Sequence, residues 1–363
     1  MNKTCVFILV LLWPLAAAAQ ADSPRSWDEL VAAARKEGKV VVLGPPTTEM
    51  RQIMPAAFKA RFGITLEYLG GRSSESTARL RSERNAGVYT ADAILGGIQT
   101  MATILHREKM LDPVKPVLIL SEVLDGSKWK KGKLWFMDPE QQYVLRLFNT
   151  ASPPFYVNTN VVKPGDLRSA HDLLNPKWKG RMAAQDPTVP GPGSNQAARF
   201  YLRFGEEFVK QLYIDQKIVF SRDRRQLTDW VMRGTYPITF DAEDDELERM
   251  RKEGVPIMAV YTLPDLPGTL SGGEGLLALL NHAPHPNAAK VFANWIASKE
   301  GLEVYSRTRG GAPTRSDINA AAYLPEPSIP PPGSNYFDTY DWEFTVTTKE
   351  KIRQYMKDLL RAR

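Results

Sequence analysis

An arginine between two glycines and two serines is the strongest sign of binding chemistry in this chain. The stretch Gly70-Gly71-Arg72-Ser73-Ser74 follows an apolar run and precedes a helix-like segment. A guanidinium can grip a carboxylate or a phosphonate through two parallel hydrogen bonds, glycines let a ligand approach the backbone, and Ser73 and Ser74 offer hydroxyl groups. The alternative is a solvated Arg72 with one serine capping the helix. If Arg72 binds an anion, Arg72→Ala weakens binding by ~1.5–3 kcal/mol.

Two further pairs of polar residues stand at expected helix starts. Thr47 and Thr48 follow a β-branched run, where they either contact a ligand or cap the next helix. Ser194 and Asn195 open a helix after a loop rich in glycine and proline. Helix starts present unpaired N–H groups and the positive end of the helix dipole, so both places suit an anion.

Four single residues complete the candidate binding set. Asp186 either accepts hydrogen bonds from an amine or hydroxyl of the ligand or fixes its own loop. Arg222 follows a short strand and faces a cleft if that strand belongs to a second lobe, although neighbouring arginines also fit a plain basic surface. Asp241 ends another strand and opens an acidic run that equally fits a helix start. Tyr156 either contacts the ligand or packs in the hinge.

No set of residues predicts catalysis or metal binding. The chain lacks a GxSxG motif, and its one cysteine, Cys5, lies near the N-terminus. His282 and His285 resemble a metal pair, but adjacent prolines keep them off a helix. Residues 270–274 imitate an ATPase signature, yet no phosphate-binding GxxxxGK(S/T) loop accompanies them. We therefore predict no catalytic residue, no metal ligand and no cofactor.

The apolar pattern indicates how the candidate residues are positioned. Ser26 and Glu29 predict a capping box at the first helix. Helical and β-branched segments then alternate, which predicts a parallel sheet with crossover helices. The strands are expected at 39–43, 64–69 and 91–95, and the helices at 26–37, 50–62 and 75–86.

The second half repeats this alternation and points to a second lobe. Two extended, proline-bearing stretches, 148–157 and 261–271, are the expected crossings between lobes. The chain therefore predicts an α/β fold of two lobes, each with a mostly parallel sheet flanked by helices. The expected parts are lobe 1 at 22–150 plus 268–330, lobe 2 at 151–267, and a C-terminal segment at 331–363 that packs back on a lobe.

The N-terminus predicts export. Lys3 precedes an apolar run from 6 to 12, and Ala19-Gln20-Ala21 fits signal peptidase. We expect a signal peptide at 1–21, cleavage after about Ala21, and a periplasmic mature chain without cysteine. The formal charge is +6, and loss of Lys3 leaves 6 − 1 = +5. Basic residues are interspersed with acidic ones, which disfavours nucleic-acid binding.

Several local patterns in a fixed order carry a family resemblance. The most distinctive is Leu173-Leu174-Asn175-Pro176-Lys177-Trp178-Lys179-Gly180-Arg181. The others lie at 39–43, 57–64, 90–93, 285–292 and 298–301. With the export signal, they make the chain similar to the substrate-binding proteins of bacterial ABC importers, in the first family of extracellular solute-binding proteins and its ferric-iron-type branch. The resemblance covers nearly the whole mature chain.

This resemblance implies the type II periplasmic-binding-protein fold, in which two lobes close on a ligand at a hinge. It also implies a monomer that is not an enzyme and that delivers a small molecule to an ABC transporter permease in the inner membrane. Together with the arginine cluster, it leads us to predict a small organic anion, a carboxylate or a phosphonate, as the ligand.

Two alternatives remain open. One is a ferric-ion-binding protein of an iron importer. Iron-binding relatives hold Fe³⁺ through tyrosine phenolates, commonly an adjacent Tyr-Tyr pair, and this sequence has no such pair. The other alternative is an exported enzyme without a recognised motif.

Overall fold

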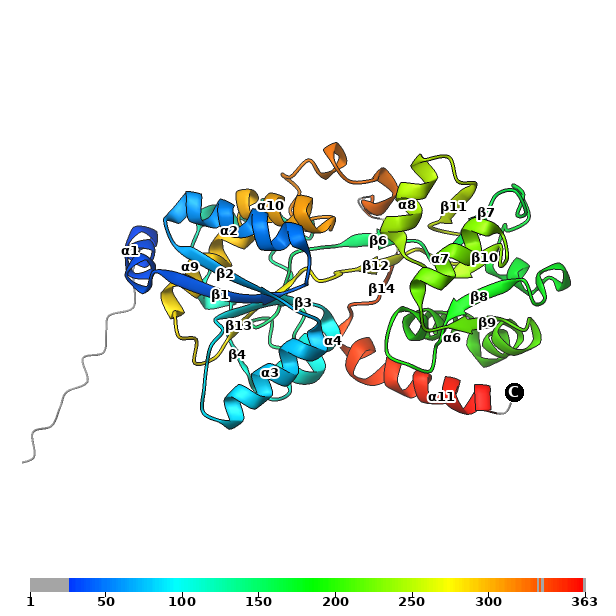
Figure 1. Cartoon of the computed structure of the whole chain (residues 1–363), viewed down its shortest axis with the longest axis horizontal. Coiled ribbons are helices and arrows are strands. Elements are labelled where there is room, and N and C mark those ends of the chain that lie inside the picture. Colours follow the sequence, from blue (N-terminus) through cyan, green and yellow to red (C-terminus); the bar gives the residue numbers. More distant parts are fainter. Residues whose placement is uncertain (1–25, 332, 334–335, 362–363) are drawn as a thin grey trace, which may run out of the picture.

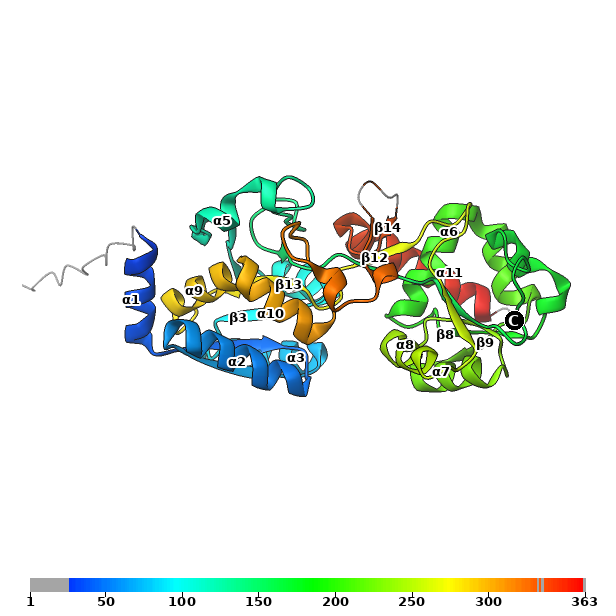
Figure 2. The ribbon, with the colours of Figure 1, turned by 90° about the horizontal axis from the view of Figure 1, so that it is seen from above.

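Two lobes joined by a narrow hinge make up the protein (Figure 1 and, turned by 90°, Figure 2). The structure, a computed structural model, describes residues 26–331, 333 and 336–361. The expected signal peptide lies outside these residues. Within the described part of the chain, no helix is both long enough and apolar enough to cross a membrane.

Lobe 1 is built on a six-stranded sheet with helices on both faces. Its strand order is β2-β1-β3-β13-β4, and β5 also pairs with β13. The strands are β1 (Lys39–Gly44), β2 (Thr65–Gly70), β3 (Ala93–Gly96), β4 (Leu111–Asp112), β5 (Leu145–Arg146) and β13 (Leu276–Leu280). The helices are α1 (Trp27–Glu37), α2 (Thr48–Phe62), α3 (Ser73–Asn85), α4 (Ile98–Thr100), α5 (Ser121–Leu124), α9 (Pro286–Ala297) and α10 (Lys299–Arg309).

The first strand shows why this sheet lies between two helical layers. Side chains of β1 alternate between the faces, so Val40 and Val42 join a buried cluster with α1, α2 and α9. Val41 and Leu43 join a second cluster that includes Leu80 of α3. A strand that is apolar at successive positions is therefore buried on both faces, as crossover helices require.

Lobe 2 is built on a five-stranded sheet with the order β11-β7-β10-β8-β9. Its strands are β7 (Phe155–Asn158), β8 (Met182–Gln185), β9 (Val219–Ser221), β10 (Ile238–Phe240) and β11 (Ile257–Val260). Its helices are α6 (Pro192–Lys210), α7 (Arg224–Arg233), α8 (Asp244–Lys252) and α11 (Lys349–Arg361). The helix α6 bends at Gly205, whose φ is 83°.

Both sheets are more mixed than the order of elements predicts. Strand β1 pairs in parallel with β2 and β3, and β8 does so with β9 and β10. However, β13 runs antiparallel to β3, and β7 runs antiparallel to β10. Both β13 and β7 enter their lobes directly from a hinge strand instead of through a crossover helix, which accounts for their reversed direction.

The hinge is a small sheet of three strands in the order β14-β12-β6. The strands β6 (Thr150–Ser152) and β12 (Thr269–Ser271) are antiparallel and fall within the two predicted crossing stretches. The third strand, β14 (Phe337–Asp338), pairs in parallel with β12 and comes from the C-terminal segment. Figure 1 shows these strands in the narrow middle of the molecule.

Beyond β14 the chain contacts lobe 1 and then lobe 2. Trp342 packs with the cluster that includes β13 and the π-helical segment Met101–His106 of lobe 1. Phe344, Ile352 and Met356 belong to the core of lobe 2, where α11 packs against α6. The C-terminal segment therefore touches both lobes, whereas the sequence predicts that it packs back on one.

Candidate ligand-binding site

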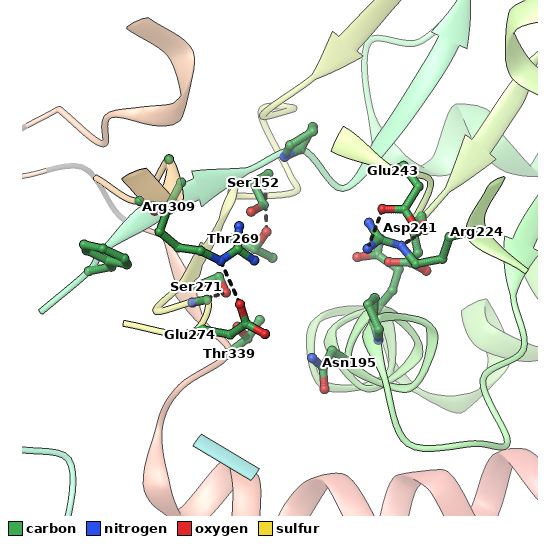
Figure 3. Close-up of a pocket in the computed structure, with 18 residues that line it drawn as sticks. Ser152, Asn195, Arg224, Asp241, Glu243, Thr269, Ser271, Glu274, Arg309 and Thr339 are labelled. Carbon is green, nitrogen blue, oxygen red and sulfur yellow. Dashed lines mark hydrogen bonds and ion pairs between the residues drawn. The ribbon is translucent and has the colours of Figure 1, made fainter. Parts of the chain in front are cut away.

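A polar cavity of about 360 Å³ lies between the lobes beside the hinge (Figure 3). Lobe 1, lobe 2 and all three hinge strands or their flanks contribute to it. Its charged lining residues are Arg224, Asp241, Glu243, Glu274 and Arg309. Its uncharged polar lining residues are Thr150, Ser152, Asn195, Gln196, Thr269, Ser271 and Thr339.

The hinge strands supply a row of hydroxyl groups to this cavity. Thr150 and Ser152 stand two residues apart on β6, and Thr269 and Ser271 do so on β12. Side chains two apart on a strand share one face, so each strand presents two hydroxyls on the cavity side. The Thr269 hydroxyl also donates to the Ser152 carbonyl at 2.8 Å, which ties the two strands together.

On the lobe 1 wall, Arg309 and Glu274 form an ion pair. The Nε of Arg309 lies 2.7 Å from Oε2 of Glu274, and both side chains are about one-third exposed. Arg309 is in the last turn of α10, a favourable place for a cation at the negative end of the helix dipole. Glu274 is held in place by the Tyr305 hydroxyl, which donates to the Glu274 carbonyl at 2.5 Å.

On the lobe 2 wall, Arg224 binds the corner that follows β10. Its Nη1 lies 3.2 Å from Oε2 of Glu243, and its Nε donates to the Asp241 carbonyl at 2.9 Å. Its Nη2 donates to the Ala242 carbonyl. Asp241 has a φ of 61°, so these bonds hold a corner whose backbone is in the left-handed region.

The start of α6 brings a second type of donor to the lobe 2 wall. Gln196 is only 4% exposed and lines the cavity, and its Oε1 accepts from Nη1 of Arg199 at 3.3 Å. Its Nε2 is buried and has no hydrogen-bond partner among the described residues. A buried donor of this kind favours an acceptor supplied by a ligand.

The charge of Arg199 lies directly behind this wall. Burial lowers the pKa of Arg199 to about 9, and the nearby Asp241 carboxylate opposes that shift. A guanidinium with this pKa remains charged at neutral pH. It therefore adds positive potential behind Gln196 and Asp241.

Figure 3 shows the two walls facing each other across the cavity. Arg309 and Glu274 lie on one side, and Arg224, Glu243 and Asn195 lie on the other. The arrangement can hold a small molecule that carries both acceptors and donors. Its acceptors would meet Arg309 and the start of α6, and its donors would meet the carboxylates and backbone carbonyls.

The structure brings two of the predicted site residues, Asn195 and Asp241, into the lining of this cavity. A third, Ser73, lines a smaller recess of lobe 1 together with Gly71 and Thr100. Glu274 lines both hollows, so the recess adjoins the main cavity.

The other predicted residues on lobe 1 stand at helix starts. The Thr47 hydroxyl oxygen caps α2 by accepting from the Met50 N–H at 3.2 Å, and Thr48 is exposed in the first turn. Arg72 and Ser74 are exposed at the start of α3 and are absent from the lining of both hollows. Their role in binding remains a prediction.

The other predicted residues on lobe 2 lie outside the cavity lining. Asp186 pairs with the exposed Arg222 at 2.9 Å. Ser194 is buried, and its hydroxyl donates to the Gly191 carbonyl at 2.9 Å. Tyr156 is 3% exposed and packs in the core beneath α7. Their role in binding also remains a prediction.

The pKa of Asp186 reflects these local contacts. Partial burial acts to raise it, but hydrogen bonds from Thr188 and the charge of Arg222 more than compensate. The pKa of Asp186 is therefore lower than that of an ordinary aspartate, and the carboxylate is stabilised by its own loop and neighbour.

Sequence reasoning missed Arg309, the lobe 1 cation of the cavity. The signal was available, because Arg309-Gly310-Gly311 combines an arginine with a glycine pair as Gly70-Gly71-Arg72 does. Arg309 ends a helix, however, whereas the unpaired N–H groups that indicate an anion site lie at helix starts. Glu274 was seen only as part of a turn, and Glu243 only as part of an acidic helix start.

The chain matches the family of bacterial extracellular solute-binding proteins over residues 53–328, and it belongs to that family. It is 23% identical over 288 residues to an uncharacterized protein of Haemophilus influenzae, a match that covers 75% of this chain and 76% of the relative.

Solved structures of periplasmic binding proteins share the fold. Iron-bound HitA of Pseudomonas aeruginosa has a TM-score of 0.63 at 15% identity, covering 88% of this chain and 99% of its own. AfuA of Actinobacillus pleuropneumoniae, with fructose-6-phosphate bound, has a TM-score of 0.60 at 18% identity, covering 90% and 99%. The Trichodesmium protein FutA, with iron and citrate, has a TM-score of 0.66 at 15% identity, covering 89% and 99%.

The chain is thus a solute-binding protein of the ABC-transporter type with the type II periplasmic-binding-protein fold. Its family acts outside the cytoplasm and consists of binding proteins. The cleft between the lobes is where such a fold encloses a ligand.

Proposed function

We propose that this protein captures a small organic anion, a carboxylate or a phosphonate, in the cavity between its lobes and delivers it to an ABC permease. The observation that carries the proposal is the pair of opposed donors. Arg309 lies on the lobe 1 side of the cavity (Figure 3), and Gln196, whose buried Nε2 has no hydrogen-bond partner among the described residues, lines the cavity from the start of α6 in lobe 2. Together they provide positive charge and hydrogen bonds, from both sides, to an acceptor group of the ligand.

The remaining lining indicates what else the ligand carries. Glu274 and Glu243 are each paired with an arginine of their own wall, so neither arginine is an isolated cation. Five threonine or serine hydroxyls complete the hinge side. A ligand that adds hydroxyl groups to its anionic group matches this lining, because it donates to the acids as well as accepting from Arg309.

Relatives with the same fold support this class of ligand. Fructose-6-phosphate, which is bound to AfuA, and citrate, which accompanies iron in FutA, are both hydroxylated anions. Closure of the two lobes around such a molecule excludes water and strengthens each charged contact.

Iron capture is less consistent with the tyrosines around the cleft. The hydroxyls of Tyr68, Tyr305 and Tyr340 donate to backbone carbonyls. Burial raises the pKa of all three, to about 12 for Tyr340. Fe³⁺ prefers deprotonated phenolates, so these groups are poorly prepared to bind it.

A ligand screen followed by a matched pair of variants tests the proposal. A molecule that binds only the folded state raises the melting temperature with its concentration, so we expect hydroxylated carboxylates or phosphonates to do so. For the best of them, Arg309→Gln lowers affinity by about 1.5–3 kcal/mol, roughly 10- to 150-fold. The control is Arg307→Gln on the same helix, which pairs with Glu303 and lies outside the cavity lining.

Equal affinity of Arg309→Gln and Arg307→Gln would contradict the proposed site. Stabilisation by neutral sugars or amines alone would contradict the anionic class while leaving the binding function intact.

A further inference from the structure

The C-terminal segment is built into the hinge residue by residue. Strand β14 pairs in parallel with β12, with Phe337 opposite Thr269 and Asp338 opposite Leu270. The Thr339 N–H and hydroxyl both bond to the Leu270 carbonyl, at 3.0 and 2.8 Å. Thr339 also lines the ligand cavity, so this segment forms part of the cavity wall.

Two glycines of the hinge leave room for two tyrosine rings of this segment. A Cβ added at Gly272 would lie 2.7 Å from Cδ1 of Tyr340, and one added at Gly268 would overlap the ring of Tyr336. The spacing is four residues on both strands, which keeps the two contacts in register. This fit gives a physical reason for Gly272 in the 270–274 stretch, which resembles an ATPase motif.

An ion pair between a buried arginine and a partly exposed aspartate fastens the segment to lobe 1. Arg146 is fully buried, and its Nη1 lies 2.6 Å from Oδ2 of Asp338. The remaining nitrogens of Arg146 donate to the Phe148 carbonyl at 2.9 Å and to Oδ1 of Asn149 at 2.8 Å. A buried charge held in this way depends strongly on its partner.

Apolar contacts fasten the same segment to lobe 2. Phe344 belongs to the buried cluster of lobe 2 and Phe337 packs against that cluster, while their own rings meet edge to face with centroids 5.1 Å apart. Tyr355 of α11 meets Tyr201 of α6 in the same way, also at 5.1 Å. Since one short segment is anchored on both lobes, a rotation of the lobes must strain or release its contacts.

We propose that residues 336–340 act as a third hinge strand that limits how far the lobes separate and that holds Thr339 at the ligand cavity. Asp338 and Tyr340 are positioning residues in this proposal, because neither lines the cavity. Only the statement about Thr339 rests on the proposed function. The restraint on the lobes stands independently of which ligand binds.

The distance between the lobes tests the proposal without a ligand. The mature chain is expected to contain no cysteine, so Lys36→Cys on α1 and Lys210→Cys on α6, both exposed, can carry a donor and an acceptor dye. We expect Asp338→Asn to widen the distribution of single-molecule energy transfer at least twofold. Asp358→Asn, an exposed carboxylate of α11 in the same segment, is the control and should match the parent protein.

A second variant covers the case in which Asp338→Asn fails to fold. Gly272→Ala forces the Tyr340 ring to move, and it should widen the distribution in the same way while circular dichroism remains native. If both folded variants give the distribution of the parent, or if Gly272→Ala does so when Asp338→Asn is unfolded, the proposal is overturned. The two proposals can fail separately. If the hinge variants widen the energy-transfer distribution but Arg309→Gln binds the anion as tightly as the parent, the third hinge strand stands and the proposed ligand site is rejected.

Discussion

Lobe 1 carries two arginines next to glycine pairs, and they differ in what other segments bring to them. Arg72 opens α3, is exposed, and has its backbone N–H bonded to Glu75 of its own helix. Arg309 closes α10 and pairs with Glu274, which comes from the turn after a hinge strand. The local sequence is similar, but only Arg309 lines the cavity next to the hinge. Proximity to the hinge, rather than the glycine–arginine pattern, identifies the stronger candidate for binding.

A third arginine, Arg224, extends the comparison, because it lines the cavity while its hydrogen bonds go to backbone carbonyls of lobe 2. We expect Arg224→Gln to lower the free energy of unfolding by about 2–4 kcal/mol, since the Asp241 and Ala242 carbonyls both lose their donor. Urea denaturation measures this loss. Unchanged stability with weakened ligand binding would instead make Arg224 a ligand contact.

The lobe 2 donor can be reversed with almost no change of shape. Gln196→Glu keeps an oxygen for Arg199 but replaces the buried amide donor with a carboxylate oxygen. We expect the affinity for an organic anion to fall by about 2 kcal/mol, roughly 30-fold, while stability is retained. Calorimetric titration of the anion identified by the screen measures it. Tighter binding would mean that this wall accepts hydrogen bonds from a cationic ligand.

A pair outside the cavity should affect stability alone. Asp186→Asn removes the ion pair with Arg222 and leaves a neutral acceptor for Thr188, and we expect a cost of about 1 kcal/mol or less at pH 7. Because the folded-state pKa of Asp186 is lowered, its contribution is present above the unfolded-state value of about 3.9 and disappears as pH falls through the folded-state value. Urea unfolding should therefore show a difference in stability between Asp186→Asn and the parent protein at pH 7, and this difference should shrink below pH 3. A loss of ligand affinity would restore Asp186 to the site.

The smallest expected effect is that of ferric iron. Because burial raises the pKa of Tyr68, Tyr305 and Tyr340, we expect no visible phenolate-to-iron charge-transfer band when Fe³⁺ is added near neutral pH. Absorbance spectroscopy of the protein with and without citrate measures it. A band that disappears in a tyrosine variant would support the ferric alternative.

Much of the local structure could be predicted because short-range signals determine it. The capping box of Ser26 and Glu29 is present, and α2 ends at Gly63 with a φ of 73°. The apolar run from 39 to 43 forms the buried strand β1, as predicted. These features depend on residues within one or two turns of each other.

The site was harder to predict because it depends on distant partners. Asn195 and Asp241 could be found, since each follows a strand of lobe 2 on the side of the cleft. Arg309 becomes a candidate only when the chain returns through β12 and places Glu274 beside it. Thr339 reaches the cavity through a pairing with Leu270, 69 residues earlier, for which the sequence carries no local signal.

The most direct test of the binding site is a side-by-side titration of the organic anion identified by the screen against Arg309→Gln and Arg72→Ala. We predict that Arg309→Gln loses about 1.5–3 kcal/mol of binding free energy and that Arg72→Ala loses less. A loss in Arg72→Ala equal to or greater than that in Arg309→Gln would contradict the account and move the anion site to the start of α3.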